Sequence, residues 1–92
     1  MSKEPVVKTI KAEDVLSNIK EIDSKISAND IDKYHRYFIR YDNKTMLGFI
    51  MDQKYGVAYR KYQDKKYTTS KITNEDEMKK VIGEIKERVK SL

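Results

Sequence analysis

The 92-residue chain carries 20 basic and 15 acidic side chains, a net charge of +5 and no cysteine. The lack of cysteine excludes disulfides, zinc–thiolate sites and thiol catalysis. A chain this short buries only about 60–65% of the surface that it exposes when unfolded, so we expect one modest domain over residues 1–92, with residues 1–5 frayed. No apolar run approaches the roughly 18 residues of a membrane span, and no signal-peptide pattern is present. The sequence therefore favours a soluble, cytoplasmic protein that does not bind membranes.

The positive charge is concentrated in the middle of the chain. Residues 33–72 contain ten basic and three acidic side chains, whereas residues 1–32 contain five lysines and seven acids, and residues 73–92 contain five of each sign. A segregated basic region attracts polyanions. A lysine-rich solubilising surface would give the same count, so charge alone does not assign a function.

An amphipathic helix is predicted near the N-terminus. From about Lys11 to Ser27, apolar side chains recur at steps of three and four, which is the spacing of one buried helical stripe. We expect this helix to end in a loop over residues 27–30. Residues 6–10 before it are compatible with either a short strand or an extended lead-in. The stripe consists of Ala12, Val15, Leu16, Ile19, Ile22 and Ile26.

The basic segment alternates apolar and polar residues and contains all seven tyrosines and both phenylalanines. Aromatic and β-branched residues in alternation are typical of strands. We expect strands at about 34–42, 45–52, 55–62 and 66–72. The short polar connections Asn43-Lys44, Gln53-Lys54 and Asp64-Lys65 then form hairpin turns. Because a sequon needs a secreted context, Asn43-Lys44-Thr45 is interpreted as a turn and not as a glycan site.

A second helix is predicted from about Thr73 to the C-terminus. Thr73 and Asn74 are good N-cap residues, and Glu77 lies three residues after Asn74, as in a capping box. Apolar residues from Met78 to Leu92 form its buried stripe. The predicted fold class is α+β: a three- to four-stranded antiparallel meander flanked by an N-terminal and a C-terminal amphipathic helix.

Two-residue turns would divide the strand residues between two faces. Both faces are apolar, whereas a sheet with one wet side alternates apolar and polar residues. Both faces are therefore expected to be covered, by one helix each, by two helices and a dimer partner, or by a ligand. The first face holds Arg36, Phe38, Arg40, Leu47, Phe49, Met51, Ala58, Arg60, Tyr62 and Tyr67, and the second holds His35, Tyr37, Ile39, Tyr41, Met46, Gly48, Ile50, Tyr55, Val57 and Tyr59.

The second face is the candidate binding surface, because tyrosine combines a flat apolar ring with a polar tip that needs a partner. Aromatic rings on strands stack nucleic-acid bases, and interleaved cations hold phosphates. The alternative is that these tyrosines pack against the helices as ordinary sheet residues. The predicted stacking residues are Tyr37, Tyr41, Tyr55 and Tyr59, and the predicted phosphate-binding residues are Arg36, Arg40, Arg60, Lys61, Lys65 and Lys66.

No catalytic, metal-binding or cofactor site is predicted. Asp42 followed by Asp52-Gln53-Lys54 superficially matches a metal-dependent nuclease pattern. A strand would separate the two aspartates by about 20 Å, too far to share a metal. His35 is the sole histidine, so histidine-based metal clusters and catalytic triads lack partners.

Two functions remain. The first is a non-enzymatic nucleic-acid-binding module, with single strands favoured. The second is a small interaction or inhibitor protein of the phage or mobile-element type, which would bind an acidic or nucleic-acid-binding host protein through the same basic sheet. A homodimer-forming structural protein is a third possibility.

Overall fold

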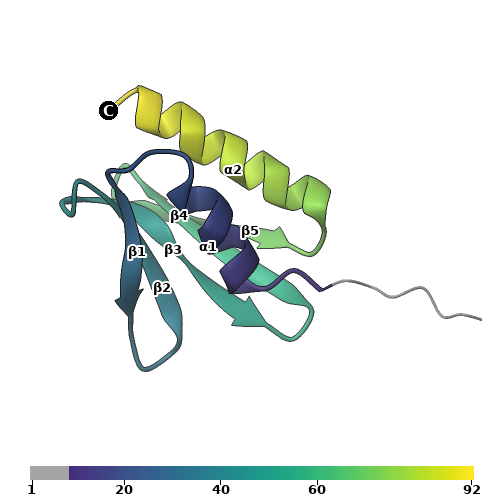
Figure 1. Ribbon diagram of the computed structural model, residues 1–92. Coiled ribbons are helices and arrows are strands. Elements are labelled where there is room, and N and C mark those ends of the chain that lie inside the picture. The colour runs from purple at the N-terminus through teal and green to yellow at the C-terminus, as the bar shows by residue number, and fades with distance from the viewer. Residues whose placement is uncertain (1–8) are drawn as a thin grey trace, which may run out of the picture.

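The computed structural model describes residues 9–92, apart from the side chain of Asn29, and shows an α+β fold with one antiparallel sheet. The sheet has more strands than the sequence predicted. The predictions for residues 1–8 lie outside the described residues. The elements are α1 (Ala12–Lys20), β1 (Ile26–Ile31), β2 (Arg36–Tyr41), β3 (Thr45–Gln53), β4 (Gly56–Gln63), β5 (Lys66–Ile72) and α2 (Glu75–Lys90) (Figure 1).

The five strands form a meander in which each strand pairs with the next in sequence. The strands β2 to β5 fall within two residues of their predicted bounds. The turn at Asp64 and Lys65 has both residues at positive φ, 54° and 63°, as a two-residue hairpin turn requires. The turn between β3 and β4 lies at Lys54 and Tyr55, one residue later than predicted.

The predicted first helix is wrong in its second half. The helix ends at Lys20, and Ile26 and the predicted loop after it form the edge strand β1. Asp23 causes the break: its Oδ1 accepts from the Lys25 amide at 2.9 Å, and its carbonyl accepts from the Ile26 amide at 3.1 Å. Such local Asp-to-backbone bonds favour turns over helix. Ile26 is still buried, as the helical stripe predicted, but it enters the core from a strand.

The start of α1 is tied to the sheet by an aspartate of β3. Asp52 Oδ1 accepts a hydrogen bond from the Ala12 amide at 2.7 Å, and Asp14 Oδ2 accepts from the Lys11 amide at 3.1 Å. Both carboxylates satisfy donors at a helix N-terminus, where negative charge is favoured. The side chain of Asp52 therefore has a structural role.

The N-cap predicted at Asn74 is confirmed, but the capping box is not closed, because the Glu77 side chain accepts from the amide of Thr73 and not from that of Asn74. Asn74 Oδ1 accepts from the Glu77 amide at 2.9 Å. Glu77 Oε1 in turn accepts from the Thr73 amide at 3.1 Å and from the Thr73 hydroxyl. The bond from Glu77 to Asn74 satisfies one of the free amides in the first turn of the helix, and the bonds from Thr73 fix the chain just before it. The helix then runs to Lys90, two residues short of the predicted end.

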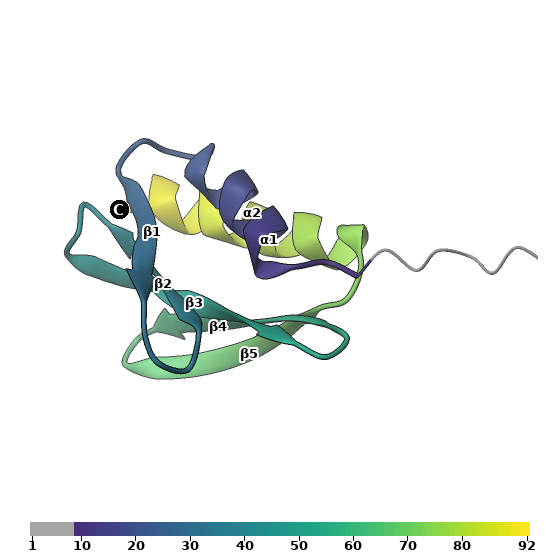
Figure 2. The ribbon, with the colours of Figure 1, turned by 60° about the horizontal axis from the view of Figure 1, so that its bottom comes forward.

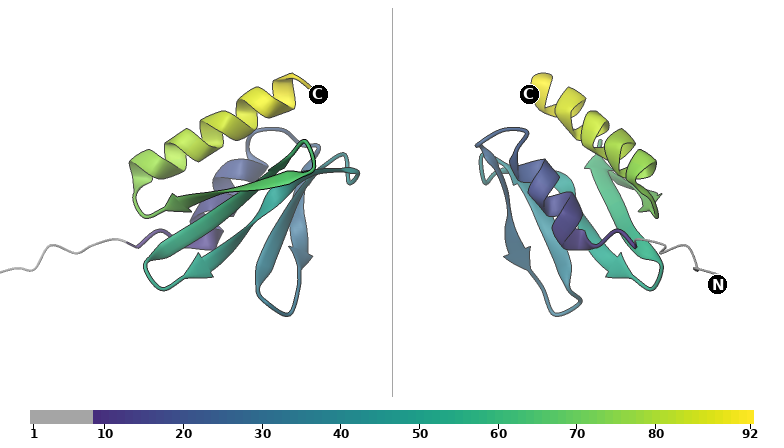
Figure 3. Two further views of the ribbon diagram at one scale, coloured as in Figure 1. Left: turned by 180° about the vertical axis from the view of Figure 1, so that it is seen from behind. Right: turned by 45° about the vertical axis from the view of Figure 1, so that its right-hand side comes forward.

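Both helices cover the same face of the sheet (Figure 2). Val15 and Ile19 of α1 and Val81 and Ile85 of α2 are buried in one cluster with apolar side chains of the strands. The opposite face carries no helix, and the left panel of Figure 3 views the strands with α1 behind them. Among the residues described, no helix is both long and apolar enough to cross a bilayer.

Candidate nucleic-acid interface

The face of the sheet opposite the helices, called the open face below, carries a grid of aromatic and basic side chains. Phe49 and Ala58 are buried on it, yet neither belongs to the core shared with the helices. The strand register places Arg36, Met51, Ala58 and Lys71 in one row across the strands, Phe38, Phe49, Arg60 and Thr69 in a second, and Tyr62 beside Tyr67 in a third.

Four aromatic rings form a continuous chain over this face. The ring centroids of Phe38 and Phe49 are 5.6 Å apart, those of Phe49 and Tyr67 are 5.8 Å apart, and those of Tyr67 and Tyr62 are 4.8 Å apart. Such tilted and edge-to-face pairs add about 0.5–1.5 kcal/mol each beyond the area they bury. These four rings come from β2, β3, β4 and β5 and contact one another in series. They are called the aromatic floor of the open face below.

Three arginines lie over these rings. The guanidinium carbon of Arg36 is 5.2 Å from the Phe49 centroid, and that of Arg40 is 5.6 Å from the Phe38 centroid. Arg60 lies 5.7 Å from the Tyr67 centroid and 6.0 Å from Phe49. At these distances a guanidinium is attracted by the ring, by about 0.5–1 kcal/mol at an exposed site. The aromatic floor therefore holds a layer of positive charge above it.

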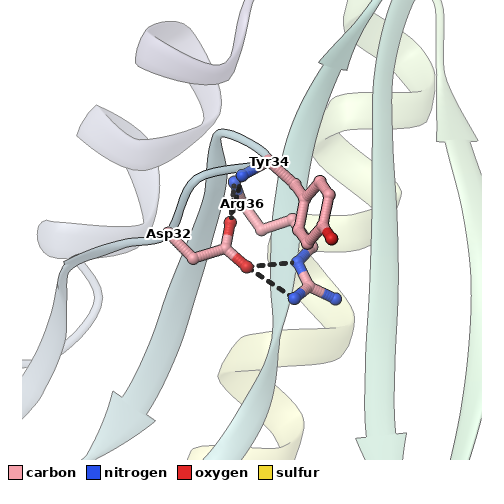
Figure 4. A network of polar contacts seen from close by, with 3 residues as sticks. All are labelled: Asp32, Tyr34 and Arg36. Carbon is pink, nitrogen blue, oxygen red and sulfur yellow. Dashed lines mark hydrogen bonds and ion pairs between the residues drawn. The ribbon is translucent and has the colours of Figure 1, made fainter.

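Arg36 is further fixed by an aspartate in the turn before β2 (Figure 4). Asp32 Oδ2 accepts from Arg36 Nε at 2.8 Å, while its Oδ1 accepts from the amides of Tyr34 at 3.0 Å and Arg36 at 3.1 Å. Bonding to the Arg36 side chain lowers the pKa of Asp32, and the same contact raises the pKa of Arg36. One carboxylate thus shapes the turn and orients the arginine.

The other two arginines differ in their partners. Arg40 Nη1 forms an ion pair with Oδ2 of Asp30 on β1. Arg60 Nε donates instead to the hydroxyl of Thr69 at 3.2 Å. Within residues 9–92, no carboxylate forms an ion pair with Arg60. Its full positive charge is therefore available at the surface.

Three of the four predicted stacking tyrosines are on the face that the helices cover. Tyr37, Tyr41 and Tyr59 lie on the side covered by the helices, where Tyr59 is 1% exposed and its hydroxyl donates to the Leu47 carbonyl at 3.4 Å. Burial raises the pKa of Tyr59 to about 12. A base cannot reach the Tyr59 ring in this arrangement. Tyr55 is exposed, but it lies in the β3–β4 turn, away from the aromatic chain.

The predicted cations fall into two groups. Arg36, Arg40 and Arg60 lie on the open face. The three predicted lysines do not join them: Lys61 lines a groove beside Glu84 and Glu87 of α2, on the helix side, whereas Lys65 and Lys66 are exposed at the β4–β5 hairpin. The structure brings together only the three arginines.

Residue-by-residue reasoning missed the aromatic floor. Phe38, Phe49, Tyr62 and Tyr67 were assigned to the first face, which was not the candidate binding surface, and Thr69 was not assigned to either face. The signal was present: Arg36, Arg40 and Arg60 share the face of these rings, and a face buried under helices does not accept three arginines. Their presence indicates that this face is the solvated one.

A β-bulge moves Leu47 away from the open face. The β2–β3 register shifts between Ile39 and Arg40, and Leu47 enters the core with the helices. Gly48 beside it has φ of 152°, and a Cβ there would lie 2.3 Å from the Arg60 carbonyl oxygen. Glycine is thus required at this close approach of β3 and β4.

The residues that the sequence analysis weighed for metal-dependent or histidine-based chemistry lie apart in the structure. Residues 9–92 contain no group of three or more His, Asp or Glu side chains that could hold a metal ion. Asp52 is used at the start of α1, and Asp42 lies in the β2–β3 turn. His35 is exposed in the turn before β2, with φ of 59°.

No family model, curated protein or solved structure matches the chain. The chemistry of the open face therefore has to carry the functional assignment. The open face offers three guanidinium groups with aromatic rings beneath them. One of these groups, that of Arg60, forms no ion pair with a carboxylate of residues 9–92 and lies beside the exposed Tyr67.

Proposed function

We propose that the protein is a small non-enzymatic nucleic-acid-binding module and that the open face is its binding surface. The observation that carries this proposal is the layer of three arginines held over aromatic rings on an uncovered sheet face. Guanidinium groups bind phosphates through paired N–H donors, and aromatic rings stack bases by about 1–3 kcal/mol each. The surface thus supplies both kinds of contact.

Single strands are the favoured ligand because their unpaired bases can stack on aromatic rings that reach the surface. A base in a duplex is already stacked on its neighbours, whereas an unpaired base is free to stack on an aromatic side chain. Tyr67 is the most accessible ring of the aromatic chain, with 47% of its surface exposed. Arg60 lies beside it, so the pair would hold one base and an adjacent phosphate. Lys71, in the same row as Ala58, adds positive charge to this face on β5.

The direct test is fluorescence anisotropy with labelled single-stranded DNA, single-stranded RNA and duplex DNA, at about 50 and 200 mM salt. We expect the single strands to bind more tightly than the duplex and to lose affinity steeply with salt. Arg60→Gln is expected to weaken binding about 3–10-fold and to reduce the log–log salt slope by about 0.7, the value for one phosphate contact on a single strand.

Lys20→Gln provides the matched control, because it removes one positive charge from the end of α1, on the helix side. It should change affinity less than about twofold, since screening weakens interactions beyond about 8–10 Å. Absence of binding at low salt would end the proposal. An equal loss for both variants would show that net charge alone is responsible.

A second function is favoured by the composition of the same surface. Arg, Tyr, Phe and Met are the residues enriched at the centres of protein interfaces, and Arg60, Tyr67, Phe38 and Met51 meet on the open face. The module could then act as an interaction or inhibitor protein on an acidic or nucleic-acid-binding partner. Pull-down from nuclease-treated host lysate, with Arg60→Gln as the control bait, separates the two functions, and light scattering tests a homodimer.

A further inference from the structure

The two halves of the open face differ in how their arginines are compensated. On β2, Arg36 and Arg40 each form an ion pair with a carboxylate from β1 or the turn that follows it. On β4, Arg60 has only the neutral hydroxyl of Thr69 as a hydrogen-bond partner among the contacts of residues 9–92. Positive charge at one end of the face is neutralised within the protein, whereas at the other end it is free.

The contact with Asp32 blocks the part of Arg36 that phosphates use. Both Nε and Nη2 of Arg36 donate to the same oxygen, Oδ2 of Asp32. These two nitrogens form the edge of the guanidinium that grips a phosphate or carboxylate with two parallel hydrogen bonds. A phosphate can take this edge only by displacing the aspartate. Asp30 contacts Arg40 through one nitrogen, Nη1, so it competes with a phosphate for that donor and leaves the Nε–Nη2 edge of Arg40 uncovered.

We infer that Asp30 and Asp32 are built-in counter-ions that compete with phosphates for Arg40 and Arg36 and so limit the affinity of the open face for nucleic acid. This inference rests on the proposed function, which names the ligand. Arg60 and Tyr67 make the first contact with the nucleic acid. The charge of Arg60 is not paired with any carboxylate of residues 9–92, and the ring of Tyr67 is exposed. A phosphate that takes the Nε–Nη2 edge of Arg36 then displaces Asp32, and one that takes Nη1 of Arg40 displaces Asp30.

Displacing the two aspartates from the arginines lowers the binding affinity only modestly, because both ion pairs lie at the surface. The side chain of Asp30 is 64% exposed and that of Asp32 is 25% exposed. Exposed ion pairs are weak, so displacing each one lowers affinity by a factor of about two to five. Removing both negative charges should therefore raise affinity for a single strand about 4–25-fold. The salt slope should steepen by up to about 0.7 for each arginine released.

Asparagine is the suitable replacement at both positions. It removes the charge while keeping one carbonyl oxygen, which can still accept from the Tyr34 and Arg36 amides as Asp32 Oδ1 does. The test variant is Asp30→Asn/Asp32→Asn. Asp30→Asn alone serves as a second variant that leaves the Asp32 turn intact, and circular dichroism verifies that each variant folds.

The matched control is Glu21→Gln/Glu84→Gln. It removes two negative charges from exposed positions at the end of α1 and within α2, on the helix side. Both double variants raise the net charge from +5 to +7. A difference between them therefore reports on position and not on total charge.

Anisotropy titrations against a single-stranded oligonucleotide, repeated over salt, decide the matter. The expected result is a gain of at least about fourfold for the aspartate variant with a steeper salt slope, a smaller gain for Asp30→Asn, and less than about twofold for the control. Adding Arg36→Gln and Arg40→Gln to the aspartate variant should abolish the gain. Equal gains in both double variants, or none in the aspartate variant, would overturn the inference while binding by the wild type still stands. No binding by any variant would overturn the proposed function together with it.

Discussion

Arg88, near the end of α2, fastens the helix to the bulged region of the sheet. Its Nη1 donates to the carbonyl of Leu47 at 3.3 Å and to that of Tyr62, and its Nη2 donates to the carbonyl of Met46 at 3.5 Å. These carbonyls lie where the bulge disturbs the strand register. Replacing Arg88 with alanine would leave all three oxygens without this donor. We expect the fold to be markedly less stable.

The size of the loss follows from the contacts. A hydrogen bond from a charged donor contributes about 1.5–3 kcal/mol, and the two long bonds contribute least. Arg88 is half-buried, so water can reach part of the vacated space. A loss of about 2–3 kcal/mol is therefore expected. With a urea m-value of about 1–1.5 kcal/mol/M for a chain of this size, the unfolding midpoint should fall by about 1.5–3 M.

Urea unfolding followed by circular dichroism measures this loss. Lys86→Ala is the control, because Lys86 is exposed on the same helix, two residues earlier. It should change stability by no more than about 0.5 kcal/mol. If Arg88→Ala unfolds within about 0.5 kcal/mol of the wild type, the carbonyls at the bulge do not depend on this side chain and the reasoning fails.

Three further predictions concern stability and pH. Gly48→Ala should destabilise the fold by about 2–4 kcal/mol in urea unfolding, because the new Cβ meets the Arg60 carbonyl. The control is Gly83→Ala, whose Cβ meets nothing within 4 Å and which should stabilise the fold by up to about 1 kcal/mol. A similar effect of both substitutions would contradict this account. The folded pKa of Tyr59 is raised from 10.0 to about 12. The contribution of the neutral Tyr59 side chain to the free energy of unfolding is therefore present below pH 10 and is lost as pH rises toward 12. The phenolate absorbance that Tyr59→Phe removes should titrate near 12, and a midpoint at 10 would show that the ring is solvated. Bonds from Thr73 hold the folded pKa of Glu77 below 4.5, so the contribution of the Glu77 carboxylate to stability is present above that pH and is lost as pH falls through the folded value. In Glu77→Gln, the melting temperature should therefore fall less steeply as the pH is lowered. An unchanged dependence on acid pH would exclude Glu77 as its source.

Local sequence signals predicted most of the sheet and the second helix. Strands β2 to β5 each carry alternation bounded by polar turn residues, and the start of α2 is set by Asn74 and Glu77, which lie three residues apart. Interactions of this kind act within a few residues of each other. They can therefore be identified from the sequence without knowing the rest of the fold.

The first strand could not be identified in this way. Ile19, Ile22 and Ile26 continue a helical spacing, so the pattern predicts helix where the chain turns at Asp23. Residues 26–31 have no clear alternation, and their pairing with β2 is itself irregular. The strand exists because β2 offers it an edge to pair with, which is information that lies outside the segment.

The choice of the free face also depends on distant parts of the chain. The sequence separated most strand residues into the correct two sets, but it could not show that both helices pack on the set containing Tyr59 and Ile50. The bulge at Leu47 adds a second difficulty, because a simple alternation places that residue on the wrong side. The three arginines of the other set are a sequence signal for the solvated face, but the position of both helices is known only from the structure.

The meander leaves β1 and β5 at the two ends of the sheet, each with one side not paired to another described strand. A free strand edge invites pairing with a second copy of the chain and hence aggregation. Here β1 is interrupted by an irregularity between Ser27 and Asp30, and β5 carries Lys66 and Lys71 near its ends. Bulges and edge lysines both oppose strand addition. The same lysines that would attract a polyanion thus also help to keep copies of this small sheet apart.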